Sequence, residues 1–349
     1  MIKKNIYIGW DIGGAHTKYT VSFESKDVVE CRIIHCELWK SLSKLEDIIE
    51  NVNFKYKKKF NIINLITMSA EMCDIFCSRK KGVKSILSLF EKRDFINHIY
   101  TKDNEILKLQ GFKKYSSCES TNWMVIADYL KSFDKNIVAI DLGSTTTDLV
   151  LIKNHICVNT RYDDYSGLNT GELLYTGVLR TPIYSVTNSI VLNKKTYNII
   201  PENFSTISDI YRLLNIIKNK SDYTNTADGR SKSIKDTLHR ISRVFGFDYT
   251  ADNNDTIIKL SKKIMSMHLD QISYTIKSHI KNNFSNAKNL KIIGMGVGRT
   301  LIQIICTKNK WKYMSLDRYI NIKYNERLCN PSDAAPSCLS SLLLKKYYE

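Results

Sequence analysis

Two short segments, 130 positions apart, carry the residues whose types and spacing could do chemistry. Residues 11–17 read DIGGAHT, and residues 141–147 read DLGSTTT. Each begins with Asp at the end of an apolar run, continues with an aliphatic residue and Gly, and ends in Thr. Because strand-like residues also follow each segment, both are predicted to be tight turns of strand–turn–strand hairpins.

The composition of the two turns suits a phosphate group. Glycine lets a ligand approach the backbone closely, and successive backbone N–H groups in such a turn can form an anion-binding nest. Hydroxyl side chains add donors without bulk, and a Lys ammonium adds a point charge. The predicted phosphate-binding residues are Gly13, Gly14, Thr17, Lys18, Gly143, Ser144, Thr145 and Thr146.

Carboxylates stand at the ends of the two leading strands. Mg²⁺ prefers hard oxygen ligands and keeps part of its hydration shell. We therefore predict that Asp11 and Asp141 hold Mg²⁺, partly through water, with Asp148 as a third candidate. Two hairpins facing each other would grip a polyphosphate from both sides. The alternative is a pair of solvated, Thr-rich turns without a ligand.

A third glycine-rich element, GMGVGRT (294–300), joins a predicted strand to a predicted helix. Gly294, Gly296 and Gly298 predict a loop that lies flat against a nucleotide or an equivalent ligand edge. A dinucleotide-binding fingerprint is the alternative, but the spacing is G-x-G-x-G and only about fifty residues follow.

The formal charge of +17 is compatible with nucleic acid, a membrane surface or an anionic small molecule as partner. Lys is spread along the whole chain, and the sequence lacks an arginine-rich arm, a zinc finger and an RNP-type motif, so no nucleic-acid partner is expected. No apolar run approaches the ~18 residues of a membrane span. Nine cysteines without CxxC spacing, and a basic start without a signal-peptide pattern, favour a cytoplasmic protein.

Hydrophobic periodicity predicts an α/β protein. Predicted strands cover residues 5–12, 17–25, 28–38, 61–69, 137–142, 149–158 and 289–293. Predicted helices cover residues 41–52, 82–93, 121–133, 206–218, 233–245, 255–283, 300–307 and 333–348.

Taken in order, DIGGAHTK, DLGSTTTD and GMGVGRT resemble the two phosphate loops and the adenosine loop of the superfamily of actin, sugar kinases and heat-shock chaperone ATPases. STNWMVIADYL (120–130) and PSDAAPSCLSSLLL (331–344) occupy the places of its connecting helices. The resemblance implies a two-lobed actin-like (ribonuclease H-like) fold, each lobe a mixed sheet flanked by helices, with a cleft between them. Lobe I is expected over 1–130 and lobe II over 131–330, with a C-terminal helix, 331–349, returning to lobe I.

Other stretches narrow the resemblance. TGELLYTGVLRTPIYSV (170–186), TADGRSKSIKDTLHRISRV (226–244) and TMSAE (67–71) resemble one branch of the hydantoinase/oxoprolinase-like proteins, linked to tetrahydromethanopterin-dependent one-carbon metabolism. Its characterised members build the furan–tyramine core of methanofuran. The resemblance implies a transferase in which the phenol of γ-glutamyltyramine displaces diphosphate from an aminomethylfuran-methyl diphosphate.

That reaction assigns expected roles to further residues. The phenol needs a base, for which Asp148, Glu71 and Glu172 are candidates, so the expected catalytic residues are Asp11, Asp141, Asp148 and Glu71. The cations that could hold diphosphate or the γ-glutamyl carboxylates are Arg180, Arg230, Lys232, Arg240 and Arg243. Asp228 and Arg230 belong to the turn sequence DGR (228–230), and ligand contacts concentrate on such loops, so Asp228 is also expected to bind substrate. His16 stands where the branch usually has Asn, and it could gain a charge near pH 6–7.

Two other functions use the same motifs. The first is an ATP-dependent enzyme, either a small-molecule kinase or an amidohydrolase subunit, with adenine near 294–298. The second is an actin-like assembly or regulatory ATPase. The sequence decides neither whether ATP binds nor the oligomeric state.

Overall fold

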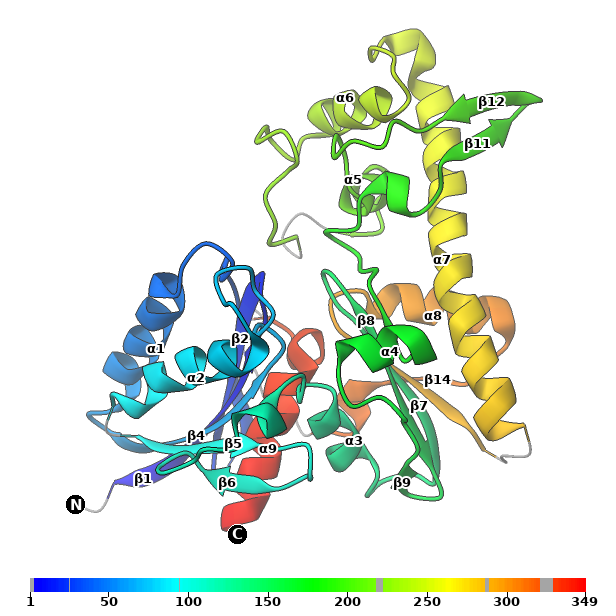
Figure 1. Ribbon diagram of the computed structural model, residues 1–349. Coiled ribbons are helices and arrows are strands. Elements are labelled where there is room, and N and C mark those ends of the chain that lie inside the picture. The colour runs from blue at the N-terminus through cyan, green and yellow to red at the C-terminus, as the bar shows by residue number, and fades with distance from the viewer. Residues whose placement is uncertain (1–2, 25, 94, 218–221, 286–288, 321–328) are drawn as a thin grey trace.

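The computed structural model describes residues 3–24, 26–93, 95–217, 222–285, 289–320 and 329–349. They form two α/β lobes side by side, with a smaller extension standing above the second lobe (Figure 1). Both chain termini lie at the base of the first lobe (Figure 1). Within the described residues, no helix is both long and apolar enough to cross a membrane.

The first lobe is built on a sheet in the order β3-β2-β1-β4-β5-β6. β1, β2 and β3 form an antiparallel meander, and β4 and β5 run parallel to β1. Alternate β1 residues point to opposite faces of the sheet. Trp10 packs with α1 and α2 on one face, whereas Tyr7 packs with Leu344 of α9 on the other. The elements are β1 (Lys4–Ile12), β2 (His16–Phe23), β3 (Lys26–His35), α1 (Ser43–Tyr56), β4 (Phe60–Met68), α2 (Arg79–Glu91), β5 (Ile96–Tyr100) and β6 (Ile106–Lys108).

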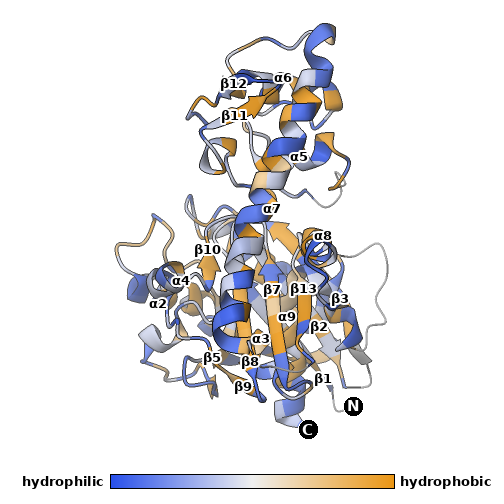
Figure 2. Ribbon diagram, turned by 90° about the vertical axis from the view of Figure 1, so that its right-hand side faces the viewer, coloured by the Kyte–Doolittle hydropathy of each residue, from blue (hydrophilic) through white to orange (hydrophobic). Residues whose placement is uncertain are grey.

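The second lobe repeats this plan with the order β10-β8-β7-β13-β14. Val138 and Ile140 of β7 pack against α7 and α8 on one face, while Ile137 and Ala139 pack against α3 and α9 on the other. Figure 2 shows the hydrophobic strands lying behind the hydrophilic outer side of α7. The elements are α3 (Met124–Leu130), β7 (Asn136–Leu142), β8 (Thr147–Lys153), β9 (Ile156–Cys157), α4 (Asp164–Thr170), β10 (Leu173–Leu174), α7 (Asn254–Phe284), β13 (Lys291–Met295), α8 (Arg299–Asn309), β14 (Tyr313–Ser315) and α9 (Ala335–Tyr348).

Both sheets share one topology. Each sheet has three antiparallel strands at one edge, β3-β2-β1 or β10-β8-β7, followed by two strands parallel to the last of these, β4-β5 or β13-β14. The first sheet ends in a further strand, β6, which is antiparallel to β5. Two such lobes make the two-lobed ribonuclease H-like fold of the actin-like ATPases, which confirms the predicted fold class. Helix α9 contacts both lobes, since it packs on β1 and also shares a core cluster with β7.

The extension consists of β11 (Ser189–Leu192), β12 (Lys195–Asn198), α5 (Ile207–Leu213), α6 (Ile234–Val244) and the first half of α7 (Figure 1). The predicted helix 206–218 is shorter than expected. It ends at Leu213, and Asn215 then has a left-handed φ of 56°. Position 218 lies outside the described residues, as does position 25 at the end of the predicted strand 17–25.

Both predicted hairpins are confirmed as β1–β2 and β7–β8. In register, Asp11 pairs with Lys18, and Asp141 pairs with Asp148. The predicted strand 149–158 is divided, because Asn154 and the residue after it have positive φ values and turn the chain into β9.

Candidate active site

A cleft of about 440 Å³ lies where the two hairpin turns face each other between the lobes. Many of the residues singled out from the sequence line it, and they come from both hairpins and from the segment after β10. They are Asp11, Gly13, Gly14, Lys18, Asp141, Gly143, Ser144, Thr145, Thr146, Asp148 and Arg180. Thr17 is buried and does not line the cleft.

The repeated sequence forms a repeated structure. In the first turn the backbone N–H of Gly13 donates to the carbonyl of His16 at 3.1 Å, and in the second that of Gly143 donates to the carbonyl of Thr146 at 2.9 Å. The turns also touch, since Ser144 Oγ lies 3.3 Å from His16 Nδ1. Side chains 128 positions apart thus close one side of the cleft.

Lys18 lies among the carboxylates at the centre of the cleft. Its Nζ is 2.9 Å from Asp11 Oδ2. Burial alone would lower the pKa of Lys18, but attraction to Asp11, Asp141 and Asp148 outweighs it and raises that pKa. Lys18 therefore carries its positive charge throughout the physiological range.

Asp141 lies in the opposite situation. Burial raises its pKa to about 7, with Asp148 and Asp11 adding to the rise and Lys18 opposing it. A neighbouring cation stabilises the ionised form of such a carboxylate, because its charge compensates for the hydration lost on burial.

Two carboxylate oxygens at this point fit a bound Mg²⁺. Asp11 Oδ1 and Asp141 Oδ1 are both buried and have no hydrogen-bond partner. Among the described residues, no group of three or more His, Cys, Asp or Glu side chains is close enough to form a complete metal site. The remaining ligands would therefore be water and substrate oxygens, which is the usual way Mg²⁺ is held.

The segment after β10 braces the second turn. The backbone N–H groups of Leu179 and Arg180 donate to the Ser144 carbonyl at 3.1 and 2.9 Å. A Cβ on Gly177 would lie 2.6 Å from the backbone of Ser144 and Thr145, so only glycine allows this approach. The stretch TGVLR (176–180) therefore has a structural role, which is to support the second turn.

Arg180 extends from this segment into the cleft, as its predicted role requires. Its guanidinium lies 4.9 Å from the ring centre of Trp39, a cation–π contact that joins the two lobes. It also reaches Thr145 Oγ1 at 3.4 Å. Of the predicted substrate-binding side chains, Arg180 is the one among the cleft-lining residues.

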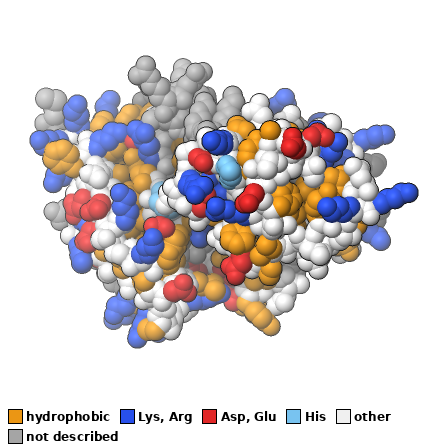
Figure 3. All heavy atoms as spheres, turned by 90° about the horizontal axis from the view of Figure 1, so that it is seen from above, with side chains coloured by type: hydrophobic (Ala, Val, Ile, Leu, Met, Phe, Trp, Pro, Cys, Tyr) orange, Lys and Arg blue, Asp and Glu red, His pale blue; other side chains and the backbone are white. Residues whose placement is uncertain are grey.

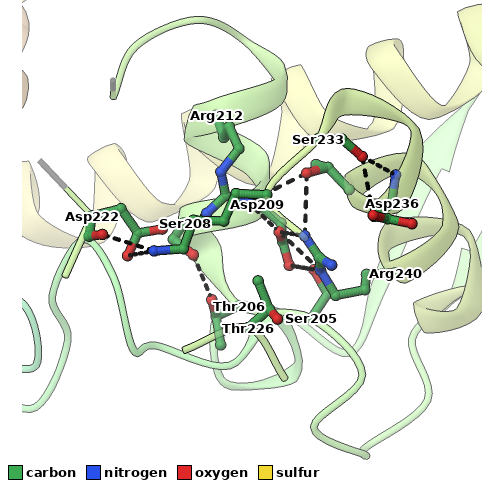
Figure 4. A network of polar contacts seen from close by, with 12 residues as sticks. Ser205, Thr206, Ser208, Asp209, Arg212, Asp222, Thr226, Ser233, Asp236 and Arg240 are labelled. Atoms are coloured by element: carbon green, nitrogen blue, oxygen red, sulfur yellow. Dashed lines mark hydrogen bonds and ion pairs between the residues drawn. The ribbon is translucent and has the colours of Figure 1, made fainter. Parts of the chain in front are cut away.

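The other predicted substrate-binding residues lie in the extension, where Arg240 belongs to the polar network of Figure 4. The Arg240 side chain is fully buried and bonds Asp209 at 2.8 Å and Asp228 at 3.1 Å. Lys232 pairs with Asp222 at 3.3 Å. The prediction that Arg240 contacts substrate is therefore wrong, because buried carboxylates already occupy its guanidinium.

The remaining residues of that prediction also lie away from the cleft. Asp228 accepts from Arg240, and about half of the Arg230 side chain is exposed on the loop beside it. Arg243 lies on α6 of the same extension. The turn sequence 228–230 predicts a ligand contact, whereas in the structure Asp228 pairs with Arg240 and Arg230 of the same extension.

The glycine loop differs from its expected role. Gly298 N–H donates to the Leu142 carbonyl at 2.9 Å, and a Cβ on Gly296 would lie 2.3 Å from Asp141 Oδ1. Gly294 packs against Tyr313. None of the three glycines lines the cleft among the described residues. The loop instead supports the carboxylate end of β7.

Two predicted base candidates are already bound by the protein. Asp148 Oδ1 accepts from Arg161 at 2.7 Å, and the Arg161 guanidinium lies 4.2 Å from the ring centre of Trp123. Glu172 is buried and accepts backbone N–H bonds from residues 160 and 161. Glu172 does not line the cleft, so its role is structural.

His16 does not behave as expected. Burial, reinforced by Lys18, His35 and Arg180, lowers its pKa to about 3. It is therefore neutral at physiological pH, rather than gaining a charge near pH 6–7.

Several cleft residues are not predicted from the sequence, among them Trp39, Asp164 and Tyr175. Trp39 follows β3 and Asp164 begins α4, and both lie in segments without a motif. Tyr175 follows β10 within the stretch 170–186, whose resemblance assigned it no role. Their position depends on the packing of the lobes, so no local pattern could have identified them.

The chain resembles known proteins over most of its length. The hydantoinase/oxoprolinase family profile matches residues 122–333. A protein of Methanocaldococcus jannaschii named (4-{4-[2-(gamma-L-glutamylamino)ethyl]phenoxymethyl}furan-2-yl)methanamine synthase is 31% identical over 84% of this chain and 87% of its own length. A protein of Methanococcus vannielii with the same name is 28% identical over 62% of this chain and 93% of its own length.

A solved structure of a ROK-family glucokinase from Streptomyces griseus aligns over 97% of this chain and 99% of its own, with 10% identity and a TM-score of 0.46. The family itself follows from sequence. Its profile covers more than half of the chain, and the first relative exceeds 30% identity over more than two thirds of it. The chain therefore belongs to the hydantoinase/oxoprolinase family.

Proposed function

We propose that this protein is a transferase of methanofuran biosynthesis. It joins the phenol oxygen of γ-glutamyltyramine to the methylene carbon of an aminomethylfuran-methyl diphosphate and releases diphosphate. Two relatives named for the synthase of this furan–tyramine ether support the proposal. The observation that carries it is the pair of matching turns, with Asp11, Lys18 and Asp141 between them, on one cleft.

The charges of the cleft suit diphosphate as a leaving group. When the CH₂–O bond breaks, its electron pair leaves with the diphosphate, whose growing charge must be stabilised. Lys18 and Arg180 supply positive charge, and the two glycine turns supply backbone N–H donors. Mg²⁺ held by Asp11 and Asp141 would add Lewis-acid stabilisation of the same oxygens.

Aromatic side chains surround the same space. Trp39 comes from the first lobe and Tyr175 from the second, with Met72 beside them. These surfaces suit the furan and phenol rings, because face or edge contacts between aromatic rings stabilise binding. The furan ring also shares the positive charge that develops on its CH₂ group, so a loose transition state is expected.

The alternative is an ATP-dependent reaction, in which adenine would lie near residues 294–298. Gly296 and Gly298 are packed against the end of β7 and do not line the described cleft. The two relatives named for the ether synthase favour a substrate that carries its own diphosphate over ATP.

The test is a direct product assay. Purified protein, Mg²⁺, γ-glutamyltyramine and the furan diphosphate are mixed, and the ether and free diphosphate are measured by mass spectrometry and a coupled diphosphate assay. We expect the two products in equal amounts, and Asp141→Asn should form neither. Turnover of ATP to ADP, with no ether from the furan diphosphate, would refute the proposal.

A further inference from the structure

A hydroxyl group bridges two carboxyl groups at the wall of the cleft. Ser120 Oγ lies 2.8 Å from Asp164 Oδ1 and 3.1 Å from Glu71 Oε1. Glu71 and Ser120 belong to the first lobe, and Asp164 begins α4 of the second. Asp164 lines the cleft, whereas Glu71 is fully buried behind it. The three groups form one polar chain from the cleft into the protein.

This chain has room for one shared proton, which it lacks before the phenol reacts and holds afterwards. A hydroxyl has one hydrogen and donates to one acceptor at a time. When both carboxyls lie within bonding distance of Ser120 Oγ, the second contact is favourable only if one carboxyl is itself protonated. Either carboxyl can hold that proton, and the hydroxyl can transfer it between them.

The backbone at Ser120 adopts a strained conformation that supports this geometry. Ser120 has a left-handed φ of 51°, which is uncommon for a residue other than glycine. The conformation lets both its N–H, at 3.0 Å, and its hydroxyl reach the same oxygen of Glu71. Such strained residues concentrate at functional sites. The other oxygen, Glu71 Oε2, is buried without a partner.

Charged groups around the chain leave both carboxyls poised to take protons. Burial raises the pKa of Glu71 to about 7, with Asp164 adding to the rise and Arg79 opposing it. Burial also raises the pKa of Asp164, where Asp148 adds to the rise and Arg79 and Arg161 oppose it. Tyr175, the nearest cleft phenol, keeps its proton, because burial and then Asp164 raise its pKa.

We propose that Asp164 is the general base that takes the proton of the acceptor's phenol, and that Ser120 passes it on to Glu71. This inference rests on the proposed function. The phenol O–H proton moves to the Asp164 carboxylate as the phenol oxygen forms its bond to the methylene carbon. The C–O bond to diphosphate breaks, and its electron pair leaves with the diphosphate. Both carboxyls are ionised before the phenol reacts, so Asp164 can then give its proton to Ser120 Oγ, whose own proton moves to Glu71. The chain ends with a single proton, held by Glu71.

The proposal changes the roles expected from the sequence. Glu71 was a candidate for the base itself, but it does not line the cleft. It is the final acceptor of the chain and therefore a positioning residue. Asp164 touches the cleft directly, and its carboxylate is bonded to a hydroxyl rather than to a cation such as the one on Asp148.

The experiment compares two acceptors across pH. One is γ-glutamyltyramine, and the other is a ring-fluorinated analogue with a more acidic phenol. The kcat/KM of each is measured from pH 5.5 to 9 for the wild type, Asp164→Asn, Ser120→Ala and Glu71→Gln. A matched control, Asp163→Asn, alters the neighbouring carboxylate that caps α4 through Ser166 and leaves Asp164 in place.

We expect Asp164→Asn to lower kcat/KM by about 10²–10⁴-fold with γ-glutamyltyramine. The loss should be at least about tenfold smaller with the fluorinated phenol, which needs less help to lose its proton. Ser120→Ala and Glu71→Gln should show a smaller loss with the same dependence on the acceptor. They should also shift the rising limb of the pH profile, a change that a purely structural role would not produce.

The outcomes separate the two proposals. A wild-type enzyme that forms no ether refutes the proposed function and this inference with it. A wild-type enzyme that forms ether, with Asp164→Asn equally impaired for both acceptors, refutes the base assignment alone and indicates that Asp164 binds substrate. Asp163→Asn should lower the rate equally for both acceptors. If Asp164→Asn does not fold, Ser120→Ala and Glu71→Gln test the base assignment through the same comparison of kcat/KM between the two acceptors.

Discussion

Replacing Asp141 with Asn should stabilise the metal-free protein at neutral and higher pH while removing its activity. Burial raises the Asp141 pKa from 3.8 to about 7, so the folded state keeps a proton that the unfolded state has lost between these values. Stability therefore falls as pH rises through this window and is lowest above pH 7. About three pKa units at 1.36 kcal/mol each correspond to about 4 kcal/mol. This figure already includes the attraction of Lys18.

The assay is the free energy of unfolding by urea at pH 4 and pH 8, with EDTA or with Mg²⁺. In EDTA, the stability of the wild type relative to Asp141→Asn should fall by about 4 kcal/mol between the two pH values. At pH 8, Mg²⁺ should stabilise the wild type and leave the variant unchanged, because the ion binds the carboxylate that the variant lacks. A stability difference that does not change with pH, or an equal effect of Mg²⁺ on both proteins, would refute this reasoning.

Three further outcomes are expected. Gly177→Ala should lower kcat about tenfold or more without changing the far-UV circular dichroism, because its Cβ would push the second turn out of position. Arg180→Ala should raise the apparent KM for the diphosphate substrate about tenfold, whereas Arg230→Ala, on its exposed loop, should leave steady-state kinetics unchanged. Arg240→Met should lower the free energy of unfolding by about 3–5 kcal/mol and leave KM unchanged in folded protein. The change removes the ion pairs of Arg240 with Asp228 and with buried Asp209, which then keeps Arg212 as its arginine partner.

The parts of the site that lie within a few residues of each other could be predicted from the sequence. The two hairpins follow from an apolar strand, Asp-x-Gly and a second strand, and they contain Asp11, Lys18 and Asp141. A hairpin is decided by local turn chemistry and by alternation along its strands. The repeat added the information that the two turns have equivalent roles.

Contacts between distant segments could not be predicted. Arg240 lies in a stretch that contains several cations and a turn, a combination typical of a ligand site. Its partner Asp209, however, is 31 positions away on another helix. Asp164 likewise has no motif of its own, and it reaches Ser120 only because α4 packs at the lobe boundary. A single sequence indicates which groups are able to pair, but which pairs form depends on the tertiary packing of distant segments.

The charges in the cleft also bear on why a metal ion belongs to the proposed reaction. The whole protein carries +17, and Figure 3 shows Lys and Arg side chains spread over the face seen from above. The cleft nevertheless contains more acidic than basic side chains. The lining includes Asp11, Asp74, Asp141, Asp148 and Asp164 against Lys18 and Arg180. A free diphosphate entering this space would meet like charges at close range, which disfavours binding. A cation held by Asp11 and Asp141 would offset this repulsion, so the proposed reaction predicts that diphosphate binds more tightly in the presence of Mg²⁺ than in EDTA.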